Sequence, residues 1–194
     1  MMAPNPDRRS ERARAAILDA SVALCQEEGY AKATMEGIAK RAGVGKQTIY
    51  RWWPSKAAVV LEALNETAGS VTDFPDTGDI VADLRTQMTG LVGLLTSDAF
   101  NAYATGLIAA GQTDEAIATS VLDTLIRPRV AACVRRLERA SEQGQLRADV
   151  DPEDVVELLY APLYYRLLLR TRPITTEQVT MILDLTGSAL FRRT

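Results

Sequence analysis

One short stretch near the end of the first third of the chain carries side chains that can hydrogen bond to a polyanion or to base edges. Lys46 and Arg51 are cationic donors that suit phosphate oxygens or guanine, and Gln47 can bridge the edge of adenine. The hydroxyls of Thr48 and Tyr50 suit phosphate oxygens. This chemistry requires a helix that turns one face outward.

A helix-turn-helix pattern that begins at Met35 supplies such a helix. Its two helices must cross closely, which the small Ala39 permits, and Gly43 tolerates the positive φ that the turn needs. The positions expected to be buried are Ile38, Ala42, Val44, Ile49 and Trp52. The second helix, which starts near Gly45, would then lie in the major groove of DNA. A plain helical bundle is the alternative interpretation.

The residues around this pattern extend the same surface. Thr34 is predicted to cap the first helix, and Lys56 follows the predicted cap Ser55, where a helix N-terminus also favours a phosphate. One of the two residues Trp52 and Trp53 is expected in the core and the other against the sugar-phosphate backbone, with core packing as the favoured role for each. A basic arm, which either follows the DNA or is a solvated tail, consists of Arg8, Arg9, Arg12 and Arg14.

The charge of the chain is distributed unevenly. The net charge is −3, yet residues 1–56 hold ten basic against six acidic side chains, a local charge of +4. The remainder holds twelve basic against nineteen acidic side chains, a local charge of −7. A basic N-terminal part on an acidic body indicates that only the first part meets a polyanion.

Apolar residues recur with a helical period along the chain, and no alternating β-branched run predicts a strand. Residues 69–79 are rich in turn formers and predict a linker. Beyond it, helices are expected at 79–96, 98–110, 113–143, 152–170 and 176–192. Pro128 should kink or divide the third of these, and Asp151 and Thr175 should cap the last two.

These elements predict an all-α protein of about nine helices. The expected N-terminal domain, residues 1–56, is a three-helix helix-turn-helix domain with its basic arm. The expected second domain, residues 57–194, is a helical domain for ligand binding and dimerisation.

The run from Ala33 to Lys56 resembles the DNA-binding signature of the TetR family of transcriptional regulators. The resemblance implies an all-α homodimer that binds a palindromic operator in double-stranded DNA and usually represses transcription. It assigns Thr34, Tyr50 and Lys56 to phosphates, and Lys46, Gln47 and Thr48 to bases or phosphates. Many members have a small residue where Gln47 stands, so the base preference should differ here. Residues 144–152 and 161–168 resemble, more loosely, the second domain of one TetR branch.

The resemblance also implies that the last two helices pair with those of a second protomer. A single protomer is not expected to bury all the apolar residues that these helices carry. They are Leu158, Leu159, Leu163, Leu167, Ile182, Leu183, Leu185 and Leu190.

A pocket for a small apolar or amphipathic ligand is expected between the middle helices, with ordinary core packing as the alternative. The candidate lining residues are Met88, Leu91, Leu95, Phe100, Tyr103, Leu107, Tyr160, Tyr164 and Leu168. The hydroxyls of Tyr103 and Tyr164 could orient the ligand. A ligand that prefers a wider spacing of the two reading helices would release DNA, with residues 127–129 as a hinge.

Several classes of function are disfavoured. The chain has no histidine, and Cys25 and Cys133 are its only cysteines, which argues against a zinc site. No nucleophile elbow, phosphate loop or metalloprotease motif occurs, so neither an enzyme nor a cofactor is expected. A helical protein that has lost DNA binding is disfavoured because Lys46, Tyr50 and Lys56 are all present. No long apolar run or leader is visible, which predicts a cytoplasmic protein without membrane contact.

Overall fold

The computed structural model describes residues 6–69 and 73–191, and only the backbone of residues 6–9 and Ala99. Within these ranges every regular element is a helix, apart from one isolated β-bridge between Leu146 and Phe191. The chain forms two compact units, Met1–Thr67 with Asp98–Leu125, and Ala68–Ser97 with Ile126–Thr194. The prediction of an all-α protein is confirmed. No helix in the described ranges is both long and apolar enough to cross a membrane.

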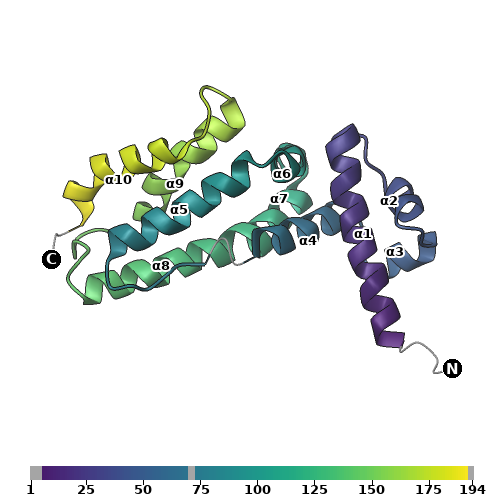
Figure 1. Cartoon of the computed structure of the whole chain (residues 1–194), viewed down its shortest axis with the longest axis horizontal. Helices are drawn as coiled ribbons and strands as arrows, with labels where there is room; N and C mark the ends of the chain where they lie inside the picture. Colours follow the sequence, from purple (N-terminus) through teal and green to yellow (C-terminus); the bar gives the residue numbers. More distant parts are fainter. Residues whose placement is uncertain (1–5, 70–72, 192–194) are drawn as a thin grey trace. The chain divides into compact units, whose positions relative to one another are not determined.

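The first unit contains the N-terminal helices and two helices from the middle of the chain (Figure 1). They are α1 (Pro6–Glu28), α2 (Met35–Arg41), α3 (Lys46–Trp52), α4 (Lys56–Ala68), α6 (Asp98–Gly111) and α7 (Glu115–Val121). α1 ends at Gly29, whose φ of 83° gives the left-handed turn that glycine adopts without strain. α6 packs against α1, and Gly106 lies so near Tyr30 that an added Cβ would be 2.5 Å from the Cβ of Tyr30.

The helix-turn-helix forms as its sequence predicts. The Thr34 hydroxyl accepts a hydrogen bond from the backbone N–H of Gly37 at 3.0 Å, which caps α2. Gly43, with a φ of 67°, makes the turn toward α3. Ile38 and Ile49 are fully buried between the two helices. Three of the expected core positions, Ala42, Val44 and Trp52, are only half-buried.

The second unit contains α5 (Ile80–Thr96), α8 (Arg127–Glu142), α9 (Pro152–Leu169) and α10 (Thr176–Leu190). The helix expected at 113–143 is divided, with a π-helical turn at Leu122–Ile126 directly before α8. Pro128 has no N–H for the carbonyl four residues earlier, so regular α-helical bonding cannot pass through this point. The predicted effect of Pro128 is thus confirmed.

The caps of the last two helices bear out the prediction in large part. Asp151 accepts a hydrogen bond from the N–H of Glu153 at 2.8 Å, and Thr175 accepts one from the N–H of Gln178 at 3.3 Å. In a complete capping box the Gln178 side chain would also accept a hydrogen bond from the backbone N–H of Thr175. Here the Gln178 side chain instead donates to the carbonyl of Pro162 at 2.9 Å. Gln178 therefore ties α10 to α9.

A single protomer buries six of the eight apolar residues named on α9 and α10 but not all of them, in agreement with the expectation from the sequence. The buried ones are Leu159, Leu163, Leu167, Ile182, Leu183 and Leu190. They are covered because α9 packs on α8 and α10 packs on α5 and α9, as Figure 1 shows. Only Leu158 and Leu185 are exposed, at 51% and 72% of their surface.

Candidate nucleic-acid interface and ligand cavity

The short helix α3 buries one side and exposes the other. Ile49 is fully buried, Thr48 is half-buried, and Tyr50 is 47% exposed. The remaining exposed residues of the predicted reading face are Gly45, Lys46, Gln47 and Arg51. Gly45 is the N-cap residue, so no side chain shields the first turn of α3. The helix therefore presents its donors and acceptors together, as contact with base edges requires.

Lys46 is paired with a carboxylate of the preceding helix. Its Nζ lies 2.6 Å from Oε1 of Glu36, and both side chains are more than half exposed. The ammonium lowers the pKa of Glu36, and the carboxylate raises the pKa of Lys46. Exposed pairs of this kind are weak because water screens them. Lys46 can therefore exchange Glu36 for a phosphate at little cost.

The two tryptophans at the end of α3 differ in burial, and a contact of either with the sugar-phosphate backbone stays a prediction. Trp53 is buried, and its Nε1 donates to Oε2 of Glu62 at 2.6 Å. Trp52 is half-buried and packs edge-to-face on Trp53 at 5.5 Å between ring centroids. The guanidinium carbon of Arg51 lies 5.2 Å from the centroid of the Trp52 ring, a cation–π arrangement that holds Arg51 at the surface.

Lys56 is directed into the first unit rather than outward. Its Nζ donates to the carbonyl of Tyr30 at 2.7 Å and lies 4.3 Å from the centroid of the Tyr30 ring. Burial lowers the pKa of this lysine. In this structure Lys56 thus joins the start of α4 to the turn that follows α1, and its assignment to a phosphate stays a prediction. Thr34, by contrast, is exposed, and its hydroxyl proton remains available after capping α2.

Two further basic residues of the first unit are neutralised by acids that lie far away in sequence. Arg41 donates two hydrogen bonds of 2.6 Å to Glu27, and Arg14 pairs with both Glu62 and Glu66. Arg14 is thus bound to α4 instead of belonging to a free arm. The side chains of Arg8 and Arg9 lie outside the described residues. The positive charge available for DNA is therefore smaller than the sequence count suggests.

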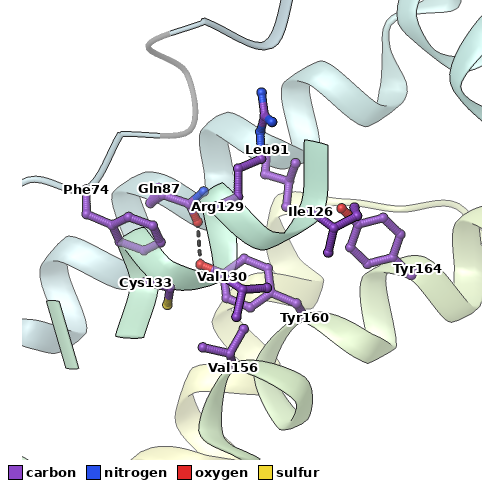
Figure 2. Close-up of a pocket in the computed structure, with 10 residues that line it drawn as sticks. All are labelled: Phe74, Gln87, Leu91, Ile126, Arg129, Val130, Cys133, Val156, Tyr160 and Tyr164. Atoms are coloured by element: carbon purple, nitrogen blue, oxygen red, sulfur yellow. Dashed lines mark hydrogen bonds between the residues drawn. The ribbon is translucent and has the colours of Figure 1, made fainter. Parts of the chain in front are cut away.

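A mostly apolar cavity of about 100 Å³ lies within the second unit (Figure 2). Its lining comes from α5, α8, α9, the turn before α8 and the segment before α5: Phe74, Gln87, Leu91, Ile126, Arg129, Val130, Cys133, Val156, Tyr160 and Tyr164. The Tyr160 hydroxyl donates to Oε1 of Gln87, which joins α9 to α5 across the cavity, as the dashed line in Figure 2 shows. The volume is below that of an engineered cavity of roughly 150 Å³ that holds benzene.

One polar group of the cavity, the guanidinium of Arg129, is cationic, whereas the tyrosine and cysteine side chains are neutral near pH 7. Burial raises the pKa of both Tyr160 and Tyr164, and it raises the pKa of Cys133 to about 12. A bound molecule would therefore meet phenolic hydroxyls and a thiol in their protonated forms. No cluster of histidine, cysteine or acidic residues in the described ranges could hold a metal ion.

The structure divides the predicted ligand residues into separate groups. Leu91, Tyr160 and Tyr164 line the cavity. Met88 and Leu95 are buried on α5 but lie outside this lining, and Leu168 is 46% exposed. Phe100, Tyr103 and Leu107 are buried in the first unit, where the Tyr103 hydroxyl donates to Thr67 at 3.1 Å.

Most of the cavity lining was missed by reasoning from the sequence. Arg129, Val130 and Cys133 follow one face of α8, but the sequence predicted a longer helix there and gave no partner for that face. Gln87 lies one position before the predicted Met88 and both are buried, so the sequence identified the helix but not which of its buried residues line the cavity. Phe74 comes from a segment that was predicted as linker, and no local signal marks it.

Comparisons with known proteins agree with this geometry. Residues 17–63 match the family described as bacterial regulatory proteins of the tetR family, and residues 74–186 match the tetracyclin repressor-like C-terminal domain. An uncharacterised HTH-type transcriptional regulator of Bacillus subtilis, YdeS, is 39% identical over 161 residues, which cover 83% of this chain and 81% of YdeS. The DNA-binding transcriptional repressor TetR of Mycobacteroides abscessus is 31% identical over 165 residues, 83% of this chain and 85% of that repressor.

A solved structure gives the same result. The TetR family transcription regulator SCO0332 superimposes with a TM-score of 0.76 at 37% sequence identity, over 90% of this chain and 97% of that one. The chain therefore belongs to the TetR family. It is a DNA-binding transcriptional regulator of the repressor type, and the family consists of regulators rather than enzymes. Regulators of this family bind DNA operators and dimerise.

Proposed function

We propose that this regulator binds a palindromic operator as a homodimer and is released when a small apolar or amphipathic molecule occupies the cavity of the second unit. The observation that carries the DNA-binding part is the exposed face of α3, where Lys46, Gln47 and Tyr50 stand beside Arg51. The cavity next to the Tyr160–Gln87 hydrogen bond supports the ligand-binding part.

Each residue of the interface receives a role from its chemistry. Gln47 reads a base edge, Lys46 reaches a guanine or a phosphate after leaving Glu36, and Arg51 does the same from the Trp52 ring. The hydroxyls of Thr34, Thr48 and Tyr50 donate to phosphate oxygens. Gly45 lets the backbone at the start of α3 approach the DNA, and Lys56 either holds α4 on Tyr30 or reaches a phosphate after rearrangement.

Dimerisation is proposed through the exposed apolar surface of α9 and α10. The exposed residues there are Leu158, Tyr165, Leu168, Leu169, Met181 and Leu185. On each helix most of them recur at spacings of three, four or seven residues and so form a stripe. An isologous pairing would cover both stripes at once and would fix the spacing of the two α3 helices. Of the eight residues predicted from the sequence for this role, the surface includes Leu158 and Leu185, and the other six are buried within the protomer.

The decisive experiment measures binding of the purified protein to the DNA that flanks its own gene. Saturable binding to one palindromic site should weaken steeply with salt and should be abolished by Lys46→Ala with Tyr50→Ala. Arg172→Ala, an exposed cation between α9 and α10, is the matched control and should bind normally. Equal binding to any DNA, or identical binding by both variants, would contradict the proposed reading face.

Ligand release has its own test. A library of small apolar compounds is screened for loss of operator binding, and any compound found is tested again on Val130→Phe. The larger ring should fill part of the cavity, so this variant should bind the operator but respond only weakly to the compound. A compound that released the variant as well as the parent protein would act at another site.

A further inference from the structure

The segment before α5 is fixed to the second unit by charged groups. Asp76 is paired with Nη1 of Arg139, and its Oδ1 lies 3.6 Å from Nε of Arg136. The Thr77 hydroxyl and backbone N–H both donate to Asp83, which is itself bound to Arg136. The position of this short segment thus depends on two arginines of α8.

A cleft of about 410 Å³ lies where this segment meets α8. Its lining residues are Asp73, Phe74, Asp76, Ala132, Arg135, Arg136 and Arg139. Three of these are arginines from neighbouring turns of one helix. Phe74 lines this cleft and also lines the apolar cavity, so this residue borders both spaces. In Figure 2 the Phe74 ring reaches from its segment toward the other cavity residues.

The guanidinium of Arg136 is only partly satisfied by the protein. The residue is 4% exposed, and its Nε and Nη2 both donate to Oδ2 of Asp83, at 2.8 and 2.6 Å. Its Nη1 is buried and has no hydrogen-bond acceptor among the described residues. A buried donor without an acceptor is costly, so this arginine gains from an additional anionic oxygen nearby.

We propose that the ligand is a small apolar carboxylic acid and that Phe74 and Asp76 occupy its place in the free protein. In the free protein the Phe74 ring occupies the position of the ligand's apolar part. The Asp76 carboxylate occupies the position of the ligand's carboxylate, beside Arg139 and Arg136. The inference rests on the proposed ligand-binding function and adds the chemical class of the ligand.

Asp76 is suited to such an exchange. Its side chain is 37% exposed and that of Arg139 is 60% exposed, so their ion pair can open without disturbing the core. Asp83, in contrast, is fully buried and stays on Arg136. Thr77 stays bound to Asp83, but Phe74 and Asp76 precede it, so a ligand carboxylate that displaces Asp76 also frees the part of the segment that holds Phe74. The cavity and the cleft would then be open to one molecule.

The test compares matched pairs of probes that differ only in charge. Hexanoate is compared with hexanol, and phenylacetate with phenylethanol, by calorimetric titration of the full chain at low salt. A charge-assisted hydrogen bond to a guanidinium should make each acid bind about tenfold or more tightly than its alcohol. Operator binding of the same sample without any probe is measured in parallel, so that a failure of the regulator itself is recognised separately.

Two variants give opposite expected shifts. Asp76→Asn removes the competing carboxylate and should strengthen binding of the acids about threefold to tenfold, whereas Arg139→Gln should weaken it about tenfold. Neither should change the affinity of the alcohols, while a merely structural effect would change acids and alcohols alike. Equal affinity of each acid and its alcohol would contradict the proposed site for a carboxylate, whereas the proposal that the cavity binds an apolar molecule would remain. Absence of binding by every probe would also overturn it, and the compound screen would still test the cavity on its own.

Discussion

Two ion pairs, one in each unit, use similar charged groups in opposite surroundings. Glu36 and Lys46 meet at the surface of the first unit, with side chains 53% and 62% exposed. Asp83 and Arg136 meet inside the second unit, with side chains 0% and 3% exposed. Water screens the first pair and makes it easy to exchange, whereas the second pair lies where an unpartnered charge is very costly. The surface pair is thus suited to binding and the buried pair to holding structure.

The largest expected effect comes from breaking the buried pair. Asp83→Ala removes the buried carboxylate partner of the Arg136 guanidinium and should lower the free energy of unfolding by about 3–5 kcal/mol, measured by urea denaturation. The double variant Asp83→Leu with Arg136→Met removes both charges and should lose less than the single variant. A single variant as stable as the parent protein would show that the pair does not hold α5 to α8.

A buried titratable group in the same unit should respond to high pH. The pKa of Cys133 is raised from 9.0 to about 12, so the folded state keeps the thiol proton over a range in which the unfolded chain loses it. Stability should therefore fall as pH rises from 9 toward 12, by about 2 kcal/mol near pH 10.5 from this group alone. Cys133→Ala should show a shallower fall in urea denaturation over this range, and an unchanged slope would contradict the assignment.

The exposed lysine of the first pair should matter for binding more than for folding. Lys46→Ala should reduce operator affinity about tenfold, and if it contacts a phosphate it should reduce the slope of log affinity against log salt by about 0.9. Thermal unfolding of the variant should match that of the parent protein. A clear loss of stability would mean that the Lys46–Glu36 pair behaves like the buried one.

The smallest effect is expected for the carboxylate partner. Glu36→Gln removes a negative charge beside the reading face and should raise the affinity for any DNA about twofold to threefold, most clearly at low salt. The lowered pKa of Glu36 means that the pair forms above its folded pKa and is lost as pH falls through that value. A weaker binding of DNA by this variant would show that Glu36 positions Lys46 for contact.

The parts of the structure that the sequence predicted depend on neighbours in the chain. Thr34 caps α2, Gly43 makes the turn and Asp151 starts α9, because each acts on backbone groups within a few residues. The exposed face of α3 could be predicted for the same reason, because the polar residues are spaced around the buried Ile49 within one short helix. The roles of these residues in DNA binding stay predictions.

The parts of the structure that the sequence did not predict depend on contacts between segments that are distant in the chain. Arg136 and Asp83 are 53 positions apart, and Gln87 and Tyr160 are 73 apart, so no local pattern joins them. The predicted ligand residues Phe100, Tyr103 and Leu107 fall in the first unit because the sequence did not reveal that α6 packs on α1. Periodicity shows that a helix has an apolar face, but not which helix covers that face.

The close approach of α6 to Tyr30 has a consequence at the level of the gene. Every nucleotide change in the Gly106 codon that alters the protein introduces a side chain or a stop, and even the smallest side chain would overlap Tyr30. Natural selection should therefore remove substitutions at this codon more strictly than at that of the exposed Gly93, where a Cβ meets open space. A saturation library selected for repression should recover glycine almost alone at position 106, whereas position 93 should admit many residues.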